Sequence, residues 1–343
     1  MRILITLLAV ALLSTYAAAQ ATPPSTDSSA QPPAHLVKKK KLIEFGWDEP
    51  DTVFLRRHHM TMEKTPFDGC VFHLPGDFLW QSWCKRTFTE AELAGALDDL
   101  RHTPTGKLTH NFLRFNVAPG EVDWFDDFSP VLANARLAAR FAREGKAAGV
   151  LFDIEQYNFQ LFDFRKQRDT KTKSWDQYAA QAKQRGREVM EAFQEGYPDL
   201  TVFLTFGYSL PYAQVKLDKT KLAEVDYGLL LPFLDGMFEA ARGKSVIVDG
   251  FEISYGYKEP KQFNEAAVSM KQTVLPMIAD AEKYRKHGSL GFGLWMDNDW
   301  RNKAWDERDV SRNHFMPEQF EQSLRKAMET ADEYVWIYTE TPK

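Results

Sequence analysis

Short apolar runs alternate with longer amphipathic stretches along most of the chain. Runs rich in β-branched and aromatic residues predict buried strands, whereas apolar positions spaced three or four residues apart predict helices that cover one face. We expect strands at residues 42–47, 67–74, 111–117, 149–152, 200–207, 245–255, 290–297 and 334–340. We expect helices at residues 52–64, 90–100, 130–144, 175–195, 227–242, 262–286 and 317–330, with Asp51 capping the first, and loops at 75–87, 119–129 and 158–173.

This alternation is typical of consecutive βαβ units, in which the strands run parallel. Eight strands within the roughly 300 residues from position 41 onward predict an α/β fold, a (β/α)8 TIM barrel formed as a single domain by residues 41–343. An open, doubly wound sheet that binds a dinucleotide would need a glycine-rich turn after its first strand, and residues 46–50 lack that pattern.

The first 40 residues have the composition of targeting and linker segments. Arg2 precedes an apolar run at 3–13, and the alanines at 17–19 fit a cleavage site, so we expect a signal peptide over residues 1–19. Residues 20–40 are rich in Pro, Ser and Thr and predict a flexible tether. We therefore expect a periplasmic or secreted protein, with no membrane insertion after signal cleavage.

Charge and aromatic content indicate which ligands to expect, and the two cysteines raise the question of a disulfide. The net charge is -5, and the basic run at 38–41 is short, so we expect no nucleic-acid partner. Aromatic residues make up 13% of the chain, which suits a cleft that stacks on flat ligand faces. Cys70 and Cys84 would be able to form a disulfide in an oxidising compartment, and a buried free thiol at Cys70 is the alternative.

Two acidic residues at the end of the fourth expected strand give the clearest functional signal. Because side chains alternate along a strand, Leu151, Asp153 and Glu155 share one face, opposite an apolar face. A buried carboxylate is costly unless it is paired or functional, and active sites of parallel barrels lie at the carboxyl ends of the strands. We interpret the two acids as part of a site, with a salt-bridged pair as the alternative.

Polar and aromatic residues recur near the ends of the other strands, as expected for a polar barrel mouth. About half of them, Arg114 most clearly, would form supporting ion pairs. Facing carboxylates suit acid and base catalysis on a glycosidic bond, and aromatic rings suit stacking on sugars. We expect the catalytic residues to be Glu155, Asp153, Glu340 and Glu252. We expect substrate binding by Trp47, Asp48, His73, Arg114, Asn116, Tyr157, Tyr208, Tyr255, Trp295, Asp297, Trp336 and Tyr338.

A barrel with Asp-x-Glu at the end of strand four resembles the TIM-barrel glycoside hydrolases, most nearly the chitinase-type families 18 and 85. The resemblance implies that Glu155 is the general acid and that Asp153 orients the acetamido group of the substrate, whose oxygen attacks. It also implies that Tyr255 or Tyr257 holds that group. Family 18 carries two further Asp residues upstream, where this chain has Ala148 and Leu151. A two-carboxylate mechanism, with Glu155 and either Glu340 or Glu252, therefore stays open.

We expect neither a metal nor another cofactor, because the histidines lack zinc-like spacing. The acidic loop at 297–306 has oxygen ligands for Ca²⁺, but a polar loop explains it more simply. The expected function is that of an exported glycoside hydrolase acting on a poly- or oligosaccharide. One alternative is a polysaccharide lyase, with Tyr338 or His73 as base beside Arg114. Another is a non-catalytic carbohydrate-binding barrel.

Overall fold

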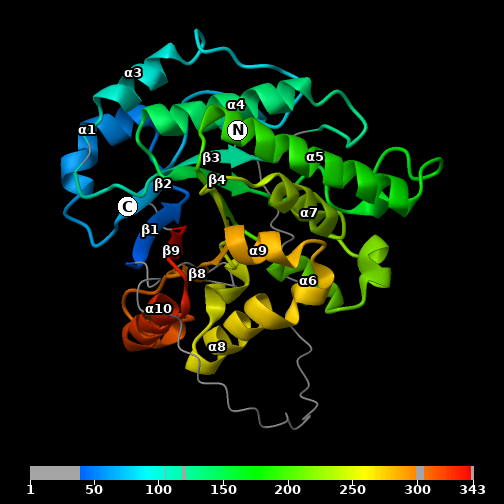
Figure 1. The fold of residues 1–343 in the computed structure, drawn as a ribbon. Helices are drawn as coiled ribbons and strands as arrows, with labels where there is room; N and C mark the ends of the chain where they lie inside the picture. The colour runs from blue at the N-terminus through cyan, green and yellow to red at the C-terminus, as the bar shows by residue number, and fades with distance from the viewer. Residues whose placement is uncertain (1–38, 105, 118–120, 299–304, 341–343) are drawn as a thin grey trace.

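The computed structural model describes residues 39–104, 106–117, 121–298 and 305–340 of the chain. At its centre, nine parallel strands form a nearly closed barrel, with helices on the outside (Figure 1). The predicted α/β TIM barrel is therefore confirmed. The strands are β1 (Lys41–Gly46), β2 (Gly69–Phe72), β3 (Phe112–Asn116), β4 (Gly149–Asp153), β5 (Thr201–Leu204), β6 (Val246–Asp249), β7 (Gly288–Leu290), β8 (Phe292–Trp295) and β9 (Tyr334–Thr339), in the order β7-β6-β5-β4-β3-β2-β1-β9-β8.

Helices lie between successive strands, as the alternating pattern predicts, except between β7 and β8. The α-helices are α1 (Thr52–Met62), α2 (Phe78–Gln81), α3 (Ala94–His102), α4 (Ser129–Glu144), α5 (Trp175–Gly196), α6 (Ser209–Val215), α7 (Leu230–Ala240), α8 (Pro260–Val268), α9 (Ala281–His287) and α10 (Pro317–Thr330). The predicted cap is present at α1, where the Asp51 carboxylate accepts a hydrogen bond from the Phe54 amide at 2.7 Å. The expected signal peptide and nearly all of the expected tether lie outside the described residues.

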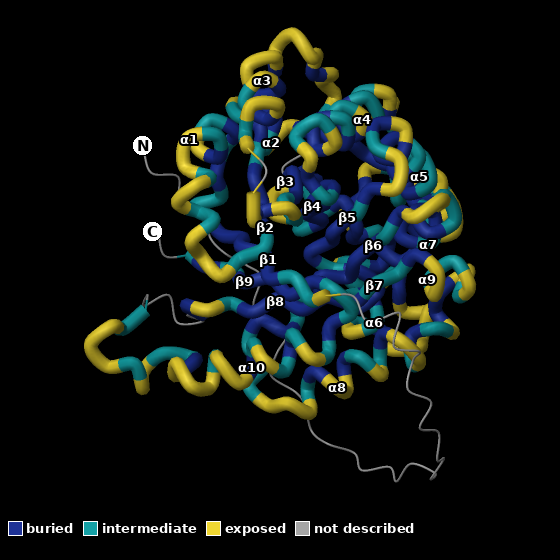
Figure 2. The backbone as a smooth tube through the Cα atoms, turned by 60° about the vertical axis from the view of Figure 1, so that its left-hand side comes forward, coloured by how far each residue is buried: buried dark blue, intermediate teal, exposed yellow. Residues whose placement is uncertain are grey.

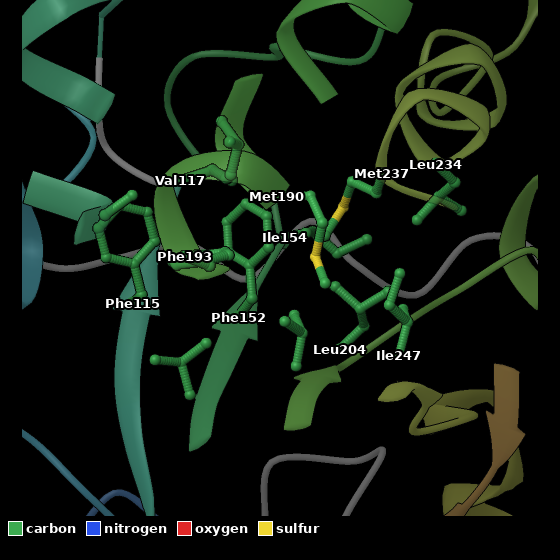
Figure 3. Close-up of a cluster of buried hydrophobic side chains, with 14 of the residues drawn as sticks. Phe115, Val117, Phe152, Ile154, Met190, Phe193, Leu204, Leu234, Met237 and Ile247 are labelled. Atoms are coloured by element: carbon green, nitrogen blue, oxygen red, sulfur yellow. The ribbon is translucent and has the colours of Figure 1, made fainter. Parts of the chain in front are cut away.

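Most strands bury side chains on both of their faces, because the barrel has an inner core and an outer layer of helices. Viewed as in Figure 2, the strands form a buried ring, and the more exposed segments lie around it. On β4, Leu151 belongs to the inner cluster, whereas Val150 and Phe152, with Ile154 just after the strand, belong to the outer one. Figure 3 shows Phe152 and Ile154 in this outer layer, where the ring centroids of Phe152 and of Phe193 from α5 lie 5.6 Å apart. The predicted alternation at β4 is therefore correct.

The seventh expected strand, at 290–297, is divided in two. β7 pairs with β6, and β8 pairs with β9, so the single expected strand contributes to both ends of the sheet order. Gly291 separates the two pieces, and a Cβ there would lie 3.0 Å from the Tyr334 carbonyl oxygen. The close approach of β9 favours glycine at the point where the chain changes partner.

Two other segments also differ from the expectation. The helix expected at 262–286 is broken into α8, a π-helical turn (Ser269–Thr273), a 3-10 turn (Leu275–Met277) and α9. Pro276 in that 3-10 turn has no N–H to continue an α-helical ladder, which accounts for the interruption. The expected loop at 75–87 contains the short helix α2.

Neither Cys70, which is buried, nor Cys84, which is partly exposed, forms a disulfide, so the disulfide considered from the sequence is wrong. Within the described ranges, no helix combines the length and apolar character needed to cross a membrane.

Candidate active site at the carboxyl ends of the strands

Asp153 and Glu155 lie where β4 ends, on the side of the chain that faces the barrel axis. Asp153 is the last residue of the strand, and the intervening Ile154 packs into the outer core. The Glu155 amide donates a hydrogen bond to Asp153 Oδ1 at 3.0 Å, which fixes the turn between them. Asp153 is 1% exposed, whereas Glu155 remains partly exposed. The two acids therefore differ in environment: one is enclosed, and the other is accessible to solvent.

Arg114 pairs with two carboxylates beneath this turn. Its Nη2 lies 2.6 Å from Asp153 Oδ2 and its Nη1 lies 2.8 Å from Glu49 Oε1, with all three side chains less than a tenth exposed. Burial alone would lower the pKa of Arg114, but Asp153 and Glu49 outweigh it and raise that pKa. Burial raises the pKa of Glu49, and Arg114 opposes that rise. Arg114 and Asp153 thus form the supporting ion pair that the sequence suggested, with Glu49 as an unforeseen third member.

Glu252 reaches the site by a turn rather than along a strand. The expected strand at 245–255 is too long: β6 ends at Asp249, and Glu252 begins a 3-10 turn (Glu252–Gly256). Phe251 directly precedes this turn, and its φ of 47° is left-handed and therefore strained for a non-glycine residue. The Glu252 amide donates to the Thr205 carbonyl at 3.2 Å, so the turn is attached to the end of β5.

Asp249 holds this turn in place. Its carboxylate accepts hydrogen bonds from the Phe251 amide at 3.0 Å, the Ser209 amide at 2.9 Å and the Ser209 hydroxyl at 2.8 Å. Trp336, from the barrel interior, donates its indole N–H to the Gly250 carbonyl at 2.8 Å. These bonds stabilise a turn that the backbone conformation of Phe251 alone would disfavour.

The carboxyl groups of Glu155 and Glu252 are hydrogen-bonded to each other. Burial and the negative charge of Asp153 raise the pKa of Glu155 to about 7. Burial, followed by the charges of Glu155 and Asp153, raises the pKa of Glu252 well above its usual range. Two carboxyls in contact share one proton over the pH range between their two ionisations. Near neutral pH the pair therefore combines a proton donor and a carboxylate.

Tyrosine hydroxyls surround the carboxyl pair. Tyr157 donates to Glu155 Oε2, and Tyr255 hydrogen-bonds to Glu252. The ring of Tyr338 stacks on that of Tyr255, with centroids 5.4 Å apart. Tyr227 places its hydroxyl beside the pair as well, where it accepts a hydrogen bond from the Gln156 amide at 3.2 Å. The hydroxyls of Tyr157 and Tyr255 thus provide one further hydrogen bond to each carboxyl of the pair.

The acids at the β8 and β9 ends form a separate group. Asp297 Oδ1 accepts from the Trp295 indole at 3.0 Å and from the Glu340 amide at 3.1 Å. Trp295 also packs edge-on against Tyr255, which joins this group to the wall of the carboxyl pair. Glu340 is partly exposed, and after burial its charge is the next cause that raises the pKa of Tyr338; the carboxyl that contacts Glu155, however, is that of Glu252.

The remaining expected binding residues are divided between the surface and the interior. Trp47 is 56% exposed after β1, with Asp48 partly exposed beside it. His73 is partly exposed, and its Nδ1 lies 2.9 Å from the Leu74 carbonyl oxygen. Asn116 and Trp336 are almost fully buried. Tyr208 is buried in the outer layer, where its hydroxyl donates to Asp235 at 2.7 Å and its ring stacks on Phe238.

Three residues around the carboxyl pair were missed by sequence reasoning. Glu49 looked like part of a helix-start loop, Asp249 like a mid-strand residue, and Tyr227 like the start of a helix. The Asp249-Gly250 dipeptide was an available turn signal that argued against a continuous strand. Nothing comparable in the local pattern marks Glu49 or Tyr227.

Over the parts of the chain that the structure describes, no group of three or more His, Cys, Asp or Glu residues is arranged to hold a metal ion. The acidic loop considered for Ca²⁺ lies partly outside those parts, at 299–304. The chain matches no protein-family model, and a search of curated proteins finds no relative.

Proposed function

We propose that this protein is an exported glycoside hydrolase in which Glu155 and Glu252 act together on the glycosidic bond. The observation that carries the proposal is the hydrogen-bonded carboxyl pair at the ends of β4 and β6. Two carboxyls from different strands, in contact with each other and partly accessible to solvent, are unfavourable for folding and are suited to proton transfer.

The chemistry follows from the single proton that the pair holds near neutral pH. The shared proton lies on Glu252 in the free enzyme, because the pKa of Glu252 is raised further than that of Glu155. In the reaction it crosses the hydrogen bond to Glu155, which transfers it to the glycosidic oxygen as the bond to the anomeric carbon breaks. The carboxylate of Glu252 attacks the anomeric carbon and forms a glycosyl–enzyme ester. Glu155, now ionised, takes a proton from water, whose oxygen displaces Glu252 and regenerates the original pair.

The spacing of the pair favours this two-step route. An inverting enzyme needs about 6.5–9.5 Å between its carboxyls to leave room for water, whereas a retaining enzyme needs only about 5–5.5 Å. Carboxyls in hydrogen-bond contact leave no room for that water between them, which favours the close-set arrangement. Asp153 is engaged with Arg114 at 2.6 Å, so we assign it to supporting Glu155 rather than to the second catalytic role.

The lyase alternative depends on Arg114, which would have to neutralise the carboxylate of a uronate. Both terminal nitrogens of Arg114 already bind carboxylates of the protein, and the side chain is 9% exposed. We therefore do not propose a lyase. A non-catalytic sugar-binding barrel has no observation in its favour beyond the exposed aromatic side chains, and the following experiment distinguishes it from the enzyme.

The purified protein should be incubated with a panel of polysaccharides and 4-nitrophenyl glycosides, alongside Glu155→Gln, Glu252→Gln and Glu340→Gln. We expect wild-type turnover to fall by about 10²–10⁴-fold in the first two variants and to persist in the third. Turnover lost in Glu340→Gln but retained in Glu252→Gln would transfer the second role to Glu340. Sugar binding without turnover by the wild type would contradict the enzyme proposal.

A further inference from the structure

Trp80 presents one face to the protein and leaves part of its ring exposed. It lies in α2, where Phe78 is fully buried and packs against Phe88 with ring centroids 5.1 Å apart. Two residues later the chain has turned by about 200°, so Trp80 points away from that anchor. Its side chain is 37% exposed.

The inner face of the indole rests on the guanidinium of Arg114. The distance from Arg114 Cζ to the Trp80 ring centroid is 5.3 Å, within the range of a cation–π contact. Arg114 is itself held by Glu49 at 2.8 Å and by Asp153 at 2.6 Å. The ring is therefore backed by a buried ion cluster that holds it in place, so little side-chain freedom remains to be lost when a ligand stacks on it.

The same ion cluster ties Trp80 to the carboxyl pair. Asp153 binds Arg114 through Oδ2 and the Glu155 amide through Oδ1. The exposed indole and the proposed acid are thus attached to one carboxylate, which lies between them. The Arg114 and Asp153 side chains thus stand between the ring and the proposed acid, so a sugar over Trp80 would be a different unit from the one at the carboxyl pair.

Other exposed aromatic residues lie at the same end of the barrel. Trp47, 56% exposed, follows β1, and Tyr157, 39% exposed, follows β4 and binds Glu155. In the strand order, β2 and β3 lie between β1 and β4, so the Trp80 segment after β2 lies between these two aromatic residues. Accessible rings thus extend from the carboxyl pair toward the β1 side of the mouth.

We propose that Trp80, backed by Arg114, is a stacking platform for a sugar unit beside the cleavage position, and that the substrate is therefore an oligo- or polysaccharide rather than a small glycoside. The proposal rests on the function proposed above and deepens it. A pyranose ring offers an apolar face to the indole, while its hydroxyls point outward to water and to polar groups around the ring.

The test measures binding separately from turnover. Glu155→Gln serves as the parent, and the probes are hexasaccharides and disaccharides of cellulose, xylan, mannan and chitin. Trp80→Leu is added to this parent, because leucine still covers Arg114 but has no flat ring. Trp175→Leu is the matched control, since Trp175 is partly exposed and packs edge-on against Phe164 at 5.7 Å. Titration calorimetry gives each dissociation constant.

We expect one hexasaccharide to bind about 10- to 100-fold more weakly after Trp80→Leu, as the loss of one stacked aromatic surface predicts. The dissociation constant of the disaccharide should change by less than about threefold after Trp80→Leu. That of the hexasaccharide should change by less than about threefold after the control substitution Trp175→Leu. Equal hexasaccharide affinity with and without Trp80, or no binding of any probe, would overturn the platform. Length-dependent binding through Trp80 with no turnover by the wild type would support the platform and reject the hydrolase.

Discussion

The carboxyl pair predicts that removing Glu155 stabilises the fold at high pH. The pKa of Glu155 is about 7 in the folded protein, against an ordinary value of 4.5. A carboxyl whose pKa is raised by folding favours the folded state when it is protonated, below about pH 4.5. That advantage is lost as the pH rises through about 7, because the folded protein must then ionise a group in an unfavourable place.

The size of the effect follows from the same two pKa values. Each pKa unit is worth about 1.4 kcal/mol, so the full rise corresponds to roughly 3 kcal/mol above pH 7. Glu155 is partly exposed, and solvent screening reduces this figure. We therefore expect Glu155→Gln to gain about 1–3 kcal/mol of unfolding free energy, relative to wild type, between pH 4 and pH 8.

The assay is urea unfolding of wild type and Glu155→Gln at pH 4, 6 and 8, with the difference in unfolding free energy plotted against pH. Loss of the hydrogen bonds of Glu155 changes this difference by the same amount at every pH, whereas loss of its ionisation makes the difference depend on pH. Glu92→Gln is the control, because hydrogen bonds from Thr89, followed by one from Arg86, lower the pKa of Glu92. For Glu92→Gln, the unfolding free energy relative to wild type should fall, not rise, as the pH increases. A difference for Glu155→Gln that stays constant across this range would refute the shared-proton interpretation.

Three further predictions concern the residues that support the pair and one exposed turn. Arg114→Met should destabilise the protein by about 3–5 kcal/mol in urea unfolding, because it leaves two buried carboxylates without their cation, and adding Asp153→Asn should recover part of the loss. Asp249→Asn replaces an acceptor with a donor opposite N–H groups; it should cost about 1–3 kcal/mol and shift the pH profile of turnover, and an unchanged profile would limit Asp249 to a structural role. Lys146→Gly relieves a φ of 55° at an exposed turn, so we expect a gain of about 0.5–1 kcal/mol, and a lower urea midpoint would contradict it.

The barrel was predictable from sequence because its signals are local. Apolar runs mark the strands, and the period of two correctly separated Leu151 from Phe152 on β4. The limits of the last strands were harder, because they depend on distant partners. Gly291 divides one apolar run into β7, which pairs with β6, and β8, which pairs with β9. The pattern of apolar residues is the same with or without that division.

The candidate site was predictable only where a strand end carried it. Asp153 and Glu155 follow directly from the alternation along β4. The contact between Glu155 and Glu252 depends on the left-handed Phe251 and on hydrogen bonds from Ser209 to Asp249, two residues far apart in the chain. Sequence reasoning placed Glu252 on a straight strand, because the local pattern does not reveal the turn after β6. It placed Tyr208 at the barrel mouth, because its hydrogen bond to Asp235 joins residues that are distant in the sequence.

The unfavourable features of this fold gather around the carboxyl pair, and that concentration is the argument for function. A purely structural pair of acids would be expected to share a cation, as Glu49 and Asp153 share Arg114. Glu155 and Glu252 instead lie against each other, and the strained turn that carries Glu252 is held by a buried Asp249. Folding energy alone does not explain this arrangement, because glutamine at either position would remove the repulsion and keep a hydrogen bond. Proton transfer at a pH near neutrality does explain it, since it requires one carboxyl that keeps its proton beside another that gives it up.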